Sequence, residues 1–209
     1  MFCNHSDCIK NTLKNISSKY KEKKIFLDIG CGSGERTTIF DEFNRKIYGV
    51  DNLDWRDIIH SKNIDFKKEN FLKTGLSYPD DKFDIVFSFD VIEHIDDAES
   101  LVRNAFRVLK KNGVFILGTP NRYRLFGAIL ISLGFRKFPY HPDINTKDLD
   151  PFAAHIHEYT VLELRQLLEQ CGFKVNKIHR KFYGLTGGYG IDSCGEVPFF
   201  HNIIIVAIK

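Results

Sequence analysis

The sequence lacks any apolar run long enough to cross a membrane. Its two longest apolar stretches, residues 125–135 and 203–208, fall well short of the roughly 20 residues that a spanning helix needs. The first seven residues contain no apolar segment of the kind found in secretory signals. Internal repeats and low-complexity tracts are also lacking. These absences argue against a membrane-spanning, exported or repeat protein and predict a cytoplasmic one.

Cysteine is sparse and dispersed. The five cysteines lie at positions 3, 8, 31, 171 and 194, an odd number without regular spacing, so we expect reduced thiols. Cys3 and Cys8 could form half of a zinc site, but no second pair lies near them in the sequence, which favours free surface thiols. The net charge of +3 is modest and the basic residues are scattered, so composition does not call for a nucleic-acid partner.

The chain contains enough apolar residues for one substantial core. With 209 residues, 43% of them hydrophobic, it can form one α/β domain over 1–209. We expect residues 1–22 to form a helical extension and residues 121–158 to form an inserted lid over the substrate. Insertions of that length inside a compact domain usually carry function or are disordered.

Strand-like and helix-like segments alternate along the chain. The patterns predict strands over residues 25–29, 46–51, 64–67, 83–90 and 114–117, with a final strand pair near the C-terminus. They predict helices over residues 8–19, 35–43, 54–61 and 161–170, and one that begins at Asp97 and is stopped by Asn112-Gly113. This order predicts an α/β, doubly wound, mostly parallel seven-stranded sheet, with any ligand at the carboxyl ends of its strands.

The most informative segment is Phe26 to Glu35, an apolar run that leads into Gly30, Gly32 and Gly34. Alternate glycines let the backbone turn sharply and approach a ligand closely. The spacing Gly-x-Gly-x-Gly differs from the Gly-x-Gly-x-x-Gly of dinucleotide-binding folds. Asp28, just before the glycines, would crowd a pyrophosphate but suits a ligand that carries an ammonium and a sulfonium group. The loop therefore indicates a cofactor without phosphate.

A second acidic residue ends the next predicted strand after the glycine loop. Asp51 ends the apolar segment 46–51, and a carboxylate there can accept hydrogen bonds from both ribose hydroxyls of an adenosine group. Farther on, the segment 83–90 is the near-continuous apolar run of a strand buried in a parallel sheet.

With these motifs in this order, the chain resembles the class I S-adenosylmethionine-dependent methyltransferases from about Ile25 onward. The resemblance implies a Rossmann-like methyltransferase fold, with an antiparallel seventh strand. It implies that the glycine loop surrounds the methionine part, that Asp51 holds the ribose, and that Asn70 and Phe71 lie near the adenine. Many members carry aspartate where this chain has Asn70. The full cofactor-binding set is Asp28, Gly30, Gly32, Gly34, Asp51, Asn52, Asn70, Phe71 and Asp90.

The candidates for proton handling follow the fourth strand and recur in the insertion. We single out Asp90, His94, His155 and His157 as catalytic candidates. Asp90, Glu93 and His94 are spaced to share one face if their segment is helical. The pattern is similar to the Glu-x-x-Glu-His of ubiquinone-biosynthesis O-methyltransferases and of enzymes that methylate the terminal ribose of small RNAs, with Asp90 in place of the first glutamate.

That similarity implies a divalent cation held by Asp90, Glu93 and His94, with His157 or His155 as the fourth ligand. Such a cation would lower the pKa of an acceptor hydroxyl. Two alternatives stay open. The Glu93-His94 pair can instead anchor the loop or shape the pocket, and the shorter aspartate need not reach a metal. His155 and His157 share one side of an extended segment, so they can simply line a pocket wall.

The insertion and its aromatic residues suggest the acceptor. Basic residues bracket the apolar stretch 125–135, which suits either a helix over the cofactor or a peripheral contact with a membrane surface. We predict S-adenosylmethionine-dependent methylation of a small, apolar or aromatic molecule, most readily at oxygen. One alternative is an RNA terminal-ribose methyltransferase, which the lack of a basic stripe does not favour. The other is a non-catalytic cofactor-binding module.

Overall fold

A seven-stranded sheet forms the centre of the molecule. The computed structural model describes residues 2–41, 45–57, 63–122, 133, 155–181, 189–191 and 200–209. The strands lie in the order β4-β3-β2-β5-β6-β9-β7. They are β2 (Ile25–Ile29), β3 (Lys46–Asp51), β4 (Ile64–Lys68), β5 (Phe83–Phe89), β6 (Leu109–Pro120), β7 (Lys174–Lys181) and β9 (Asn202–Ile208).

The strand directions confirm the predicted doubly wound topology. β4, β3, β2, β5 and β6 are parallel to one another, and β9 runs antiparallel to both β6 and β7. From β2 the chain moves outward to β3 and β4, then returns to place β5 on the other side of β2. The strand order therefore reverses between β2 and β5, the position at which open α/β sheets bind their ligands.

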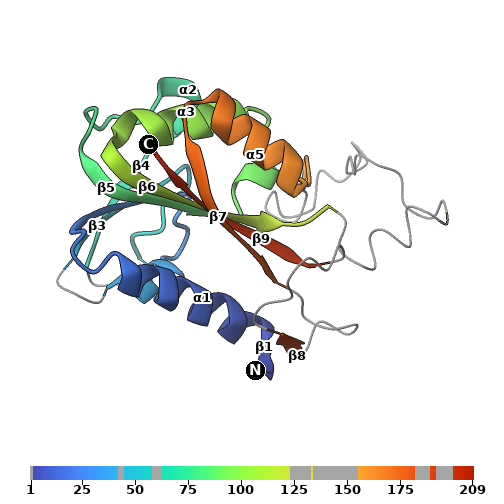
Figure 1. Ribbon diagram of the computed structural model, residues 1–209. Helices are drawn as coiled ribbons and strands as arrows, with labels where there is room; N and C mark the ends of the chain where they lie inside the picture. Colours follow the sequence, from blue (N-terminus) through green and yellow to red (C-terminus); the bar gives the residue numbers. More distant parts are fainter. Residues whose placement is uncertain are drawn as a thin grey trace.

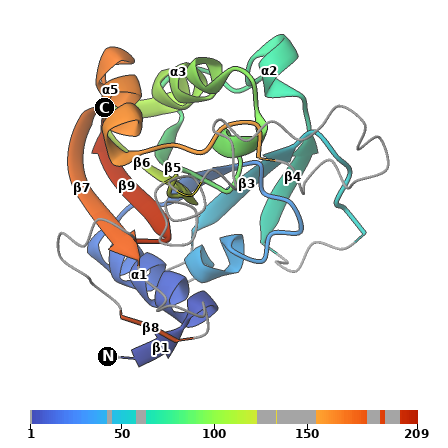
Figure 2. The same cartoon turned by 90° about the vertical axis from the view of Figure 1, so that its right-hand side faces the viewer.

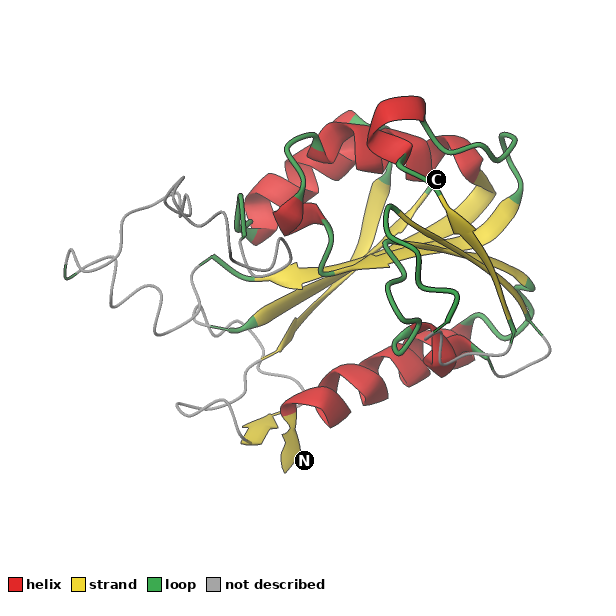
Figure 3. Ribbon diagram, turned by 180° about the vertical axis from the view of Figure 1, so that it is seen from behind, coloured by secondary structure: helices red, strands yellow, loops and turns green. Residues whose placement is uncertain are grey.

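Helices cover both faces of the sheet (Figures 1 and 3). α1 (His5–Lys19) lies on one face, whereas α2 (Phe71–Thr74), α3 (Ala98–Val108) and α5 (Val161–Gln170) lie on the other. The core divides in the same way. Leu13 and Ile16 of α1 belong to one buried cluster, and Leu101 of α3 and Leu164 of α5 belong to the other. Figure 2 views this arrangement from the side, with β7 and β4 at opposite edges of the sheet.

Local capping explains where the later helices begin. The Asp97 side chain accepts a hydrogen bond from the Ser100 amide at 2.8 Å, as expected for an N-cap. Thr160 and Glu163 form a reciprocal capping box at the start of α5. Gly172, with a φ of 96°, follows its C-terminus. The predicted positions of both helices are confirmed, apart from the C-terminus of α3.

Two predicted helical features are wrong. The helix predicted over 35–43 is only a 3₁₀ turn, η1 (Thr37–Phe40), within the described residues. The β-branched residues there favour helix weakly, and the Thr37 hydroxyl is used by a neighbouring carboxylate. α3 ends at Val108 and not at Asn112-Gly113, because buried Leu109 already pairs with Phe83 in the sheet. Asn112 instead takes a left-handed conformation, with a φ of 61°, inside β6.

Other expectations fall partly on residues outside the description. Residues 54–57 of the helix predicted over 54–61 form no helix, and residues 58–62 are not described. Of the predicted lid 121–158, only residues 121, 122, 133 and 155–158 are described. A small antiparallel pair, β1 (Phe2–Asn4) with β8 (Tyr189–Ile191), was not expected from the sequence.

The cysteines differ from the predicted set of free thiols. Cys8 is disulfide-bonded and fully buried, so the expectation that it is a free surface thiol is wrong. Cys31 and Cys171 are free, and both are buried. No helix among the described residues is long and apolar enough to span a membrane.

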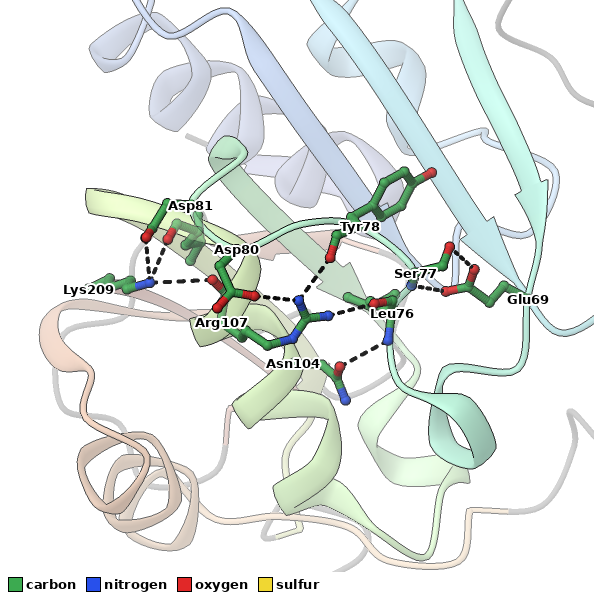
Figure 4. Close-up of polar contacts among 10 residues, drawn as sticks. Glu69, Leu76, Ser77, Tyr78, Asp80, Asp81, Asn104, Arg107 and Lys209 are labelled. Carbon is green, nitrogen blue, oxygen red and sulfur yellow. Dashed lines mark hydrogen bonds and ion pairs between the residues drawn. The ribbon is translucent and has the colours of Figure 1, made fainter.

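The amino end of the sheet is held together by a polar network (Figure 4). Arg107 of α3 donates hydrogen bonds to the carbonyl oxygens of Leu76 and Tyr78 and to the Asp80 carboxylate. The Lys209 ammonium contacts Asp81 at 2.8 Å. It also donates to the carbonyl oxygen of Leu109 at 2.7 Å. These contacts hold the turn before β5 against α3 and against the C-terminal residue.

Candidate functional site

A cavity of about 420 Å³ lies at the carboxyl ends of β3, β2 and β5. This is the point where the strand order reverses, as predicted for the ligand site. The lining residues come from the loops after these strands and after β4: Gly30, Gly32, Asp51, Asn52, Leu53, Trp55, Asn70, Phe71, Leu72, Asp90, Val91, His94 and Ile95. Because β2 lies between β3 and β5, Asp51 and His94 mark opposite sides of the cavity.

The glycine loop has the geometry that its sequence predicts. Gly30, Gly32 and Gly34 have φ values of 74°, 50° and 75°, in the left-handed region that favours glycine. A side chain on Gly30 would collide with Val91, whose Cγ2 lies 2.2 Å from the position of an added Cβ. Gly32 differs, because nothing lies within 4 Å of an added Cβ. Gly30 therefore serves packing, whereas Gly32 leaves space for a ligand.

Asp51 braces the loop from the end of β3. Its carboxylate accepts hydrogen bonds from the backbone amides of Gly32 at 2.9 Å and Leu53 at 3.0 Å. The residue is only 8% exposed, yet it lines the cavity. One bond to each oxygen leaves further acceptor capacity on both. The carboxylate can therefore hold the loop and still receive two hydroxyl groups.

Asp28 lies close to the cavity but does not line it. It is 3% exposed and accepts a hydrogen bond from the Thr37 hydroxyl at 2.5 Å. Burial raises its pKa to about 7, and the negative charge of Asp51 adds to that rise, while Thr37 and Arg36 oppose it. The structure thus places Asp28 behind the glycine loop.

Asp90 follows β5 in a strained backbone conformation. Its φ is 52°, which is uncommon for a residue with a side chain, and its amide donates to the Gly118 carbonyl oxygen at 2.9 Å. Its carboxylate forms an ion pair with Arg36, whose guanidinium lies 5.9 Å from the centre of the Phe89 ring. The side chain is therefore presented at the cavity wall against a cation.

Glu93, His94 and His155 come together just beyond Asp90. A carboxylate oxygen of Glu93 and one ring nitrogen from each histidine all lie within 4.8 Å of one another. The rings of His94 and His155 meet edge to face, with centres 4.9 Å apart. Glu93 is fully buried, with Thr119 donating to its Oε2 at 2.9 Å and no partner at its Oε1. Burial and the charge of Asp90 raise the pKa of Glu93 to about 7.

The end of the insertion is held beside this group by main-chain contacts. The carbonyl oxygen of Glu93 accepts hydrogen bonds from the amides of Ile156 at 2.7 Å and His157 at 3.2 Å. Nδ1 of His155 lies 3.0 Å from Oε1 of buried Glu158. A residue remote in sequence is thereby brought next to the loop after β5.

The predicted metal-ligand set is only partly gathered. Glu93 and His94 lie together in the 3₁₀ turn η2 (Ile92–His94), and His155 is the third member of their group. Asp90 lies outside that turn and pairs with Arg36, and Nε2 of His157 lies 2.6 Å from the Arg122 guanidinium. The shared helical face expected for Asp90, Glu93 and His94 does not form, because the segment is a short turn preceded by a left-handed residue.

Most of the predicted cofactor-binding residues line the cavity: Gly30, Gly32, Asp51, Asn52, Asn70, Phe71 and Asp90. Of the predicted catalytic residues, Asp90 and His94 line it, whereas His155 and His157 do not. Sequence reasoning missed five lining residues: Leu53, Trp55, Leu72, Val91 and Ile95. Their signal was their place in the chain, since each follows the end of a parallel strand within a few residues.

The residues present fit S-adenosylmethionine. Gly32 leaves open space for a ligand next to exposed backbone, and Asp51 offers acceptor oxygens of the kind that two neighbouring hydroxyl groups require. Phe71, Leu53 and Trp55 provide apolar surface on the β3 side, of the kind against which a flat ring such as adenine packs. Two carboxylates, those of Asp51 and Asp90, line the cavity and suit a ligand that carries positive charge.

Comparison with known proteins agrees with this geometry. The family model described as "Methyltransferase domain" matches residues 5–178. A protein of Mycolicibacterium smegmatis named "Probable S-adenosylmethionine-dependent methyltransferase" is 32% identical over 162 residues, which cover 76% of this chain and 55% of the relative. A ubiquinone biosynthesis O-methyltransferase of Histophilus somni is 27% identical over 174 residues, covering 78% of this chain and 72% of that protein.

Solved structures show the same fold. A S-adenosylmethionine-dependent methyltransferase of Archaeoglobus fulgidus matches with a TM-score of 0.70 at 20% identity, covering 97% of this chain and 94% of that one. The Burkholderia thailandensis 1,6-didemethyltoxoflavin-N1-methyltransferase, solved with its substrate and S-adenosylhomocysteine, matches with a TM-score of 0.65 at 16% identity, covering 96% and 77%.

The chain matches only part of the length of several relatives. The chain spans about half of the length of several curated relatives, 55% of the Mycolicibacterium protein and 50% of a ubiquinone biosynthesis O-methyltransferase of Pelagibacter ubique. The family model nevertheless covers most of this chain, and it includes the glycine loop, Asp51, and the loop after β5. From its fold, its cavity and this match, the chain belongs to the class I S-adenosylmethionine-dependent methyltransferases.

Proposed function

We propose that the chain catalyses methyl transfer from S-adenosylmethionine to an oxygen atom of a small, apolar or aromatic molecule. The observation that carries this proposal is one cavity with Asp51 on its β3 side and His94 on its β5 side. A donor held by its ribose at Asp51 would extend across the glycine loop toward His94. Its reactive end would then face the one histidine among the described cavity-lining residues.

The chain's own residues have a limited chemical task. When bound, the donor supplies a methyl group already activated by its sulfonium. The protein must align the acceptor in line with that group and receive the acceptor's proton. An imidazole nitrogen of His94 can take the proton, because it lines the cavity and its ring contacts His155. His155 is oriented in turn by the Glu158 carboxylate.

The walls on the β5 side support an apolar acceptor. Val91 and Ile95 flank His94 there, and both are apolar. The relatives named ubiquinone biosynthesis O-methyltransferase support transfer to oxygen, and the Burkholderia structure, solved with bound 1,6-didemethyltoxoflavin, supports a small-molecule acceptor. An RNA acceptor has no comparable support. A contact of the insertion with a membrane surface stays a prediction, as does the cytoplasmic location, because most of the insertion lies outside the described residues.

A divalent cation stays a prediction as well. Glu93, His94 and His155 offer one oxygen and two nitrogens within 4.8 Å, and Glu93 Oε1 is buried without a partner. This donor set fits a cation such as Zn²⁺ or Mn²⁺. A cation held there would lower the pKa of an acceptor hydroxyl.

Label transfer tests the proposed activity directly. The protein is incubated with donor labelled in its methyl group and with separated lipid, polar-metabolite and RNA extracts. We expect label in the lipid or polar-metabolite fraction. We expect no label with a Gly32→Ala variant, because the new methyl group would occupy the open space next to Gly32, which we call the cradle. Label in RNA would favour the ribose methyltransferase. Tight donor binding without transfer to any fraction would favour the non-catalytic module.

A further inference from the structure

Arg36 and Asp90 form an ion pair that spans the cavity wall. Arg36 follows the glycine loop after β2, and Asp90 follows β5, so the pair joins the two elements between which the strand order reverses. Both side chains are about one-third exposed, 36% for Arg36 and 35% for Asp90. Asp90 lines the cavity and Arg36 does not. The guanidinium thus stands behind a carboxylate that faces the ligand space.

Apart from His94, the ionisable side chains among the described lining residues are acidic. Asp51 and Asp90 line the cavity, and the described lining residues include no lysine or arginine. Two further acidic residues, Asp28 and Glu93, are buried and do not line the cavity, and they interact electrostatically with Asp51 and Asp90 respectively. Arg36 does not line the cavity, but its positive charge acts on two of these acidic residues. It pairs with Asp90 and opposes the rise in the pKa of Asp28. Arg36 is therefore a cation that reduces the negative charge experienced by a ligand in this cavity.

The methyl donor and its product differ by one charge at the reacting atom. The donor carries a sulfonium, whereas the product that remains after transfer carries a neutral thioether. In a cavity of about 420 Å³, a charge on the wall lies within about one Debye length, roughly 8 Å, of a bound ligand. A change in wall charge must therefore alter the affinity for the donor more than the affinity for the product.

We propose that Arg36, through its ion pair with Asp90, is a specificity-determining residue that sets how strongly the site prefers the charged methyl donor over its neutral thioether product. The paired side chains add almost no net charge to the wall. Breaking the pair in one direction or the other adds a charge of opposite sign. The proposal rests on the proposed use of S-adenosylmethionine and extends it to the exchange of donor for product.

Charge-changing variants test the proposal by calorimetry. We compare Arg36→Gln, Asp90→Asn and the double variant for binding of S-adenosylmethionine, S-adenosylhomocysteine and an analogue with a protonated amine in place of the methylsulfonium. Arg36→Gln should raise the ratio of donor to product affinity about three- to tenfold, the size expected for a unit charge about 7 Å away at a site that is about one-third exposed. Asp90→Asn should lower that ratio by a similar factor.

The double variant and the amine analogue distinguish a charge effect from a structural one. The double variant should return the ratio close to the wild-type value, because its wall again carries no added charge. The amine analogue should follow the donor, and both effects should shrink at high salt. A matched control is Arg103→Gln, which breaks the exposed Arg103–Glu99 pair on α3 and should leave the ratio unchanged.

The possible results separate the two levels of the proposal. Equal changes in donor and product affinity across the variants, or no restoration in the double variant, would overturn the role of Arg36 while leaving the methyltransferase assignment intact. A wild-type protein that binds neither S-adenosylmethionine nor S-adenosylhomocysteine would instead overturn the proposed function itself.

Discussion

Arg122 donates a hydrogen bond from its Nε to the carbonyl oxygen of Glu158 at 2.7 Å, which joins the two ends of the insertion that follows β6. Its Nη1 contacts Glu163 of α5 at 2.6 Å, and its side chain is only 12% exposed. An isolated bridge between Asn121 and Tyr159 lies beside it. The stretch that carries His155 and Glu158 is therefore anchored at its base, whatever the rest of the insertion does.

This anchor predicts a separation of catalysis from donor binding. Arg122→Ala should lower kcat/KM by roughly tenfold or more, because His155 would lose its fixed position beside His94. Donor affinity should stay within about twofold, since the described partners of Arg122, which are Glu158, Glu163 and His157, do not line the cavity. Steady-state kinetics and calorimetry check the two halves. Arg122→Lys, which keeps the charge but not the forked geometry, should recover part of the activity. A parallel loss of donor binding would contradict the anchoring role.

The two glycines at the ligand should fail in different ways. Gly30→Ala should destabilise the protein by about 2–5 kcal/mol, because a left-handed backbone and a clash with Val91 both oppose the new methyl group. Gly32→Ala should cost only about 1–2 kcal/mol from its backbone. It should nevertheless abolish donor binding, since its methyl group would enter the open cradle. Denaturant unfolding and calorimetry on both variants give the comparison, and donor binding retained by Gly32→Ala would contradict the cradle.

Asp51 should be the main anchor of the donor. Asp51→Ala should weaken donor binding by about 2–4 kcal/mol if both ribose hydroxyls donate to the carboxylate. Asp51→Asn is the matched control, because its amide oxygen can still accept one bond from the backbone that Asp51 braces. It should bind the donor with intermediate affinity. Unchanged affinity of the alanine variant in calorimetry would refute the ribose assignment.

The raised pKa of Asp28 predicts how stability depends on pH. Its ordinary value is 3.8, and burial raises the pKa to about 7 in the folded protein. The folded state therefore holds a proton that the unfolded state has released. The contribution of Asp28 to the free energy of unfolding is fully present below about pH 4. It is lost as the pH rises toward 7, by at most roughly 1.4 kcal/mol per pH unit. Glu93, whose pKa is also raised to about 7, adds a loss in the same direction.

Unfolding curves between pH 5 and 8, without ligand, check this dependence. Asp28→Asn should reduce the slope and should be most stabilising, relative to wild type, near pH 8. Asp84→Asn provides the contrast, because hydrogen bonds from Lys110 and from the Lys24 and Ile25 amides lower the pKa of Asp84. It should destabilise the protein evenly across this range. Parallel curves for wild type and Asp28→Asn would contradict the raised pKa.

Metal dependence is checked with the acceptor identified by label transfer. If Glu93, His94 and His155 hold a divalent cation, chelator should lower activity, and readdition of one of Mg²⁺, Mn²⁺ or Zn²⁺ should restore it. Glu93→Gln should abolish that restoration. Full activity in chelator would leave the three residues as parts of the pocket wall.

The sequence predicted the elements whose pattern is dominated by burial. β2, β3 and β5 are apolar runs buried in the sheet. The glycines after β2 have left-handed conformations, which their residue type already favours. The place of Asp51 at the cavity follows from the same pattern, because this residue directly ends a buried strand.

The missed features depend on contacts between distant segments. The spacing of Asp90, Glu93 and His94 predicted one helical face. Asp90 instead has a left-handed backbone conformation and lies outside the turn that contains Glu93 and His94. The choice between His155 and His157 depends on the carbonyl oxygen of Glu93, which fixes the returning segment. Neither effect leaves a local pattern. The cavity side chains Trp55 and Ile95 likewise lie in loops, where residue type does not report orientation.

The position of β9 also constrains how the molecule can assemble. β6 and β7 make no ladder with one another, and β9 joins them by pairing with both. Until β9 is in place, the growing sheet has an open edge at β6, and β7 has no strand beside it. Such edges readily pair with other chains. We therefore expect chains cut before Ile203 to aggregate during synthesis, with the loss first visible as insoluble protein.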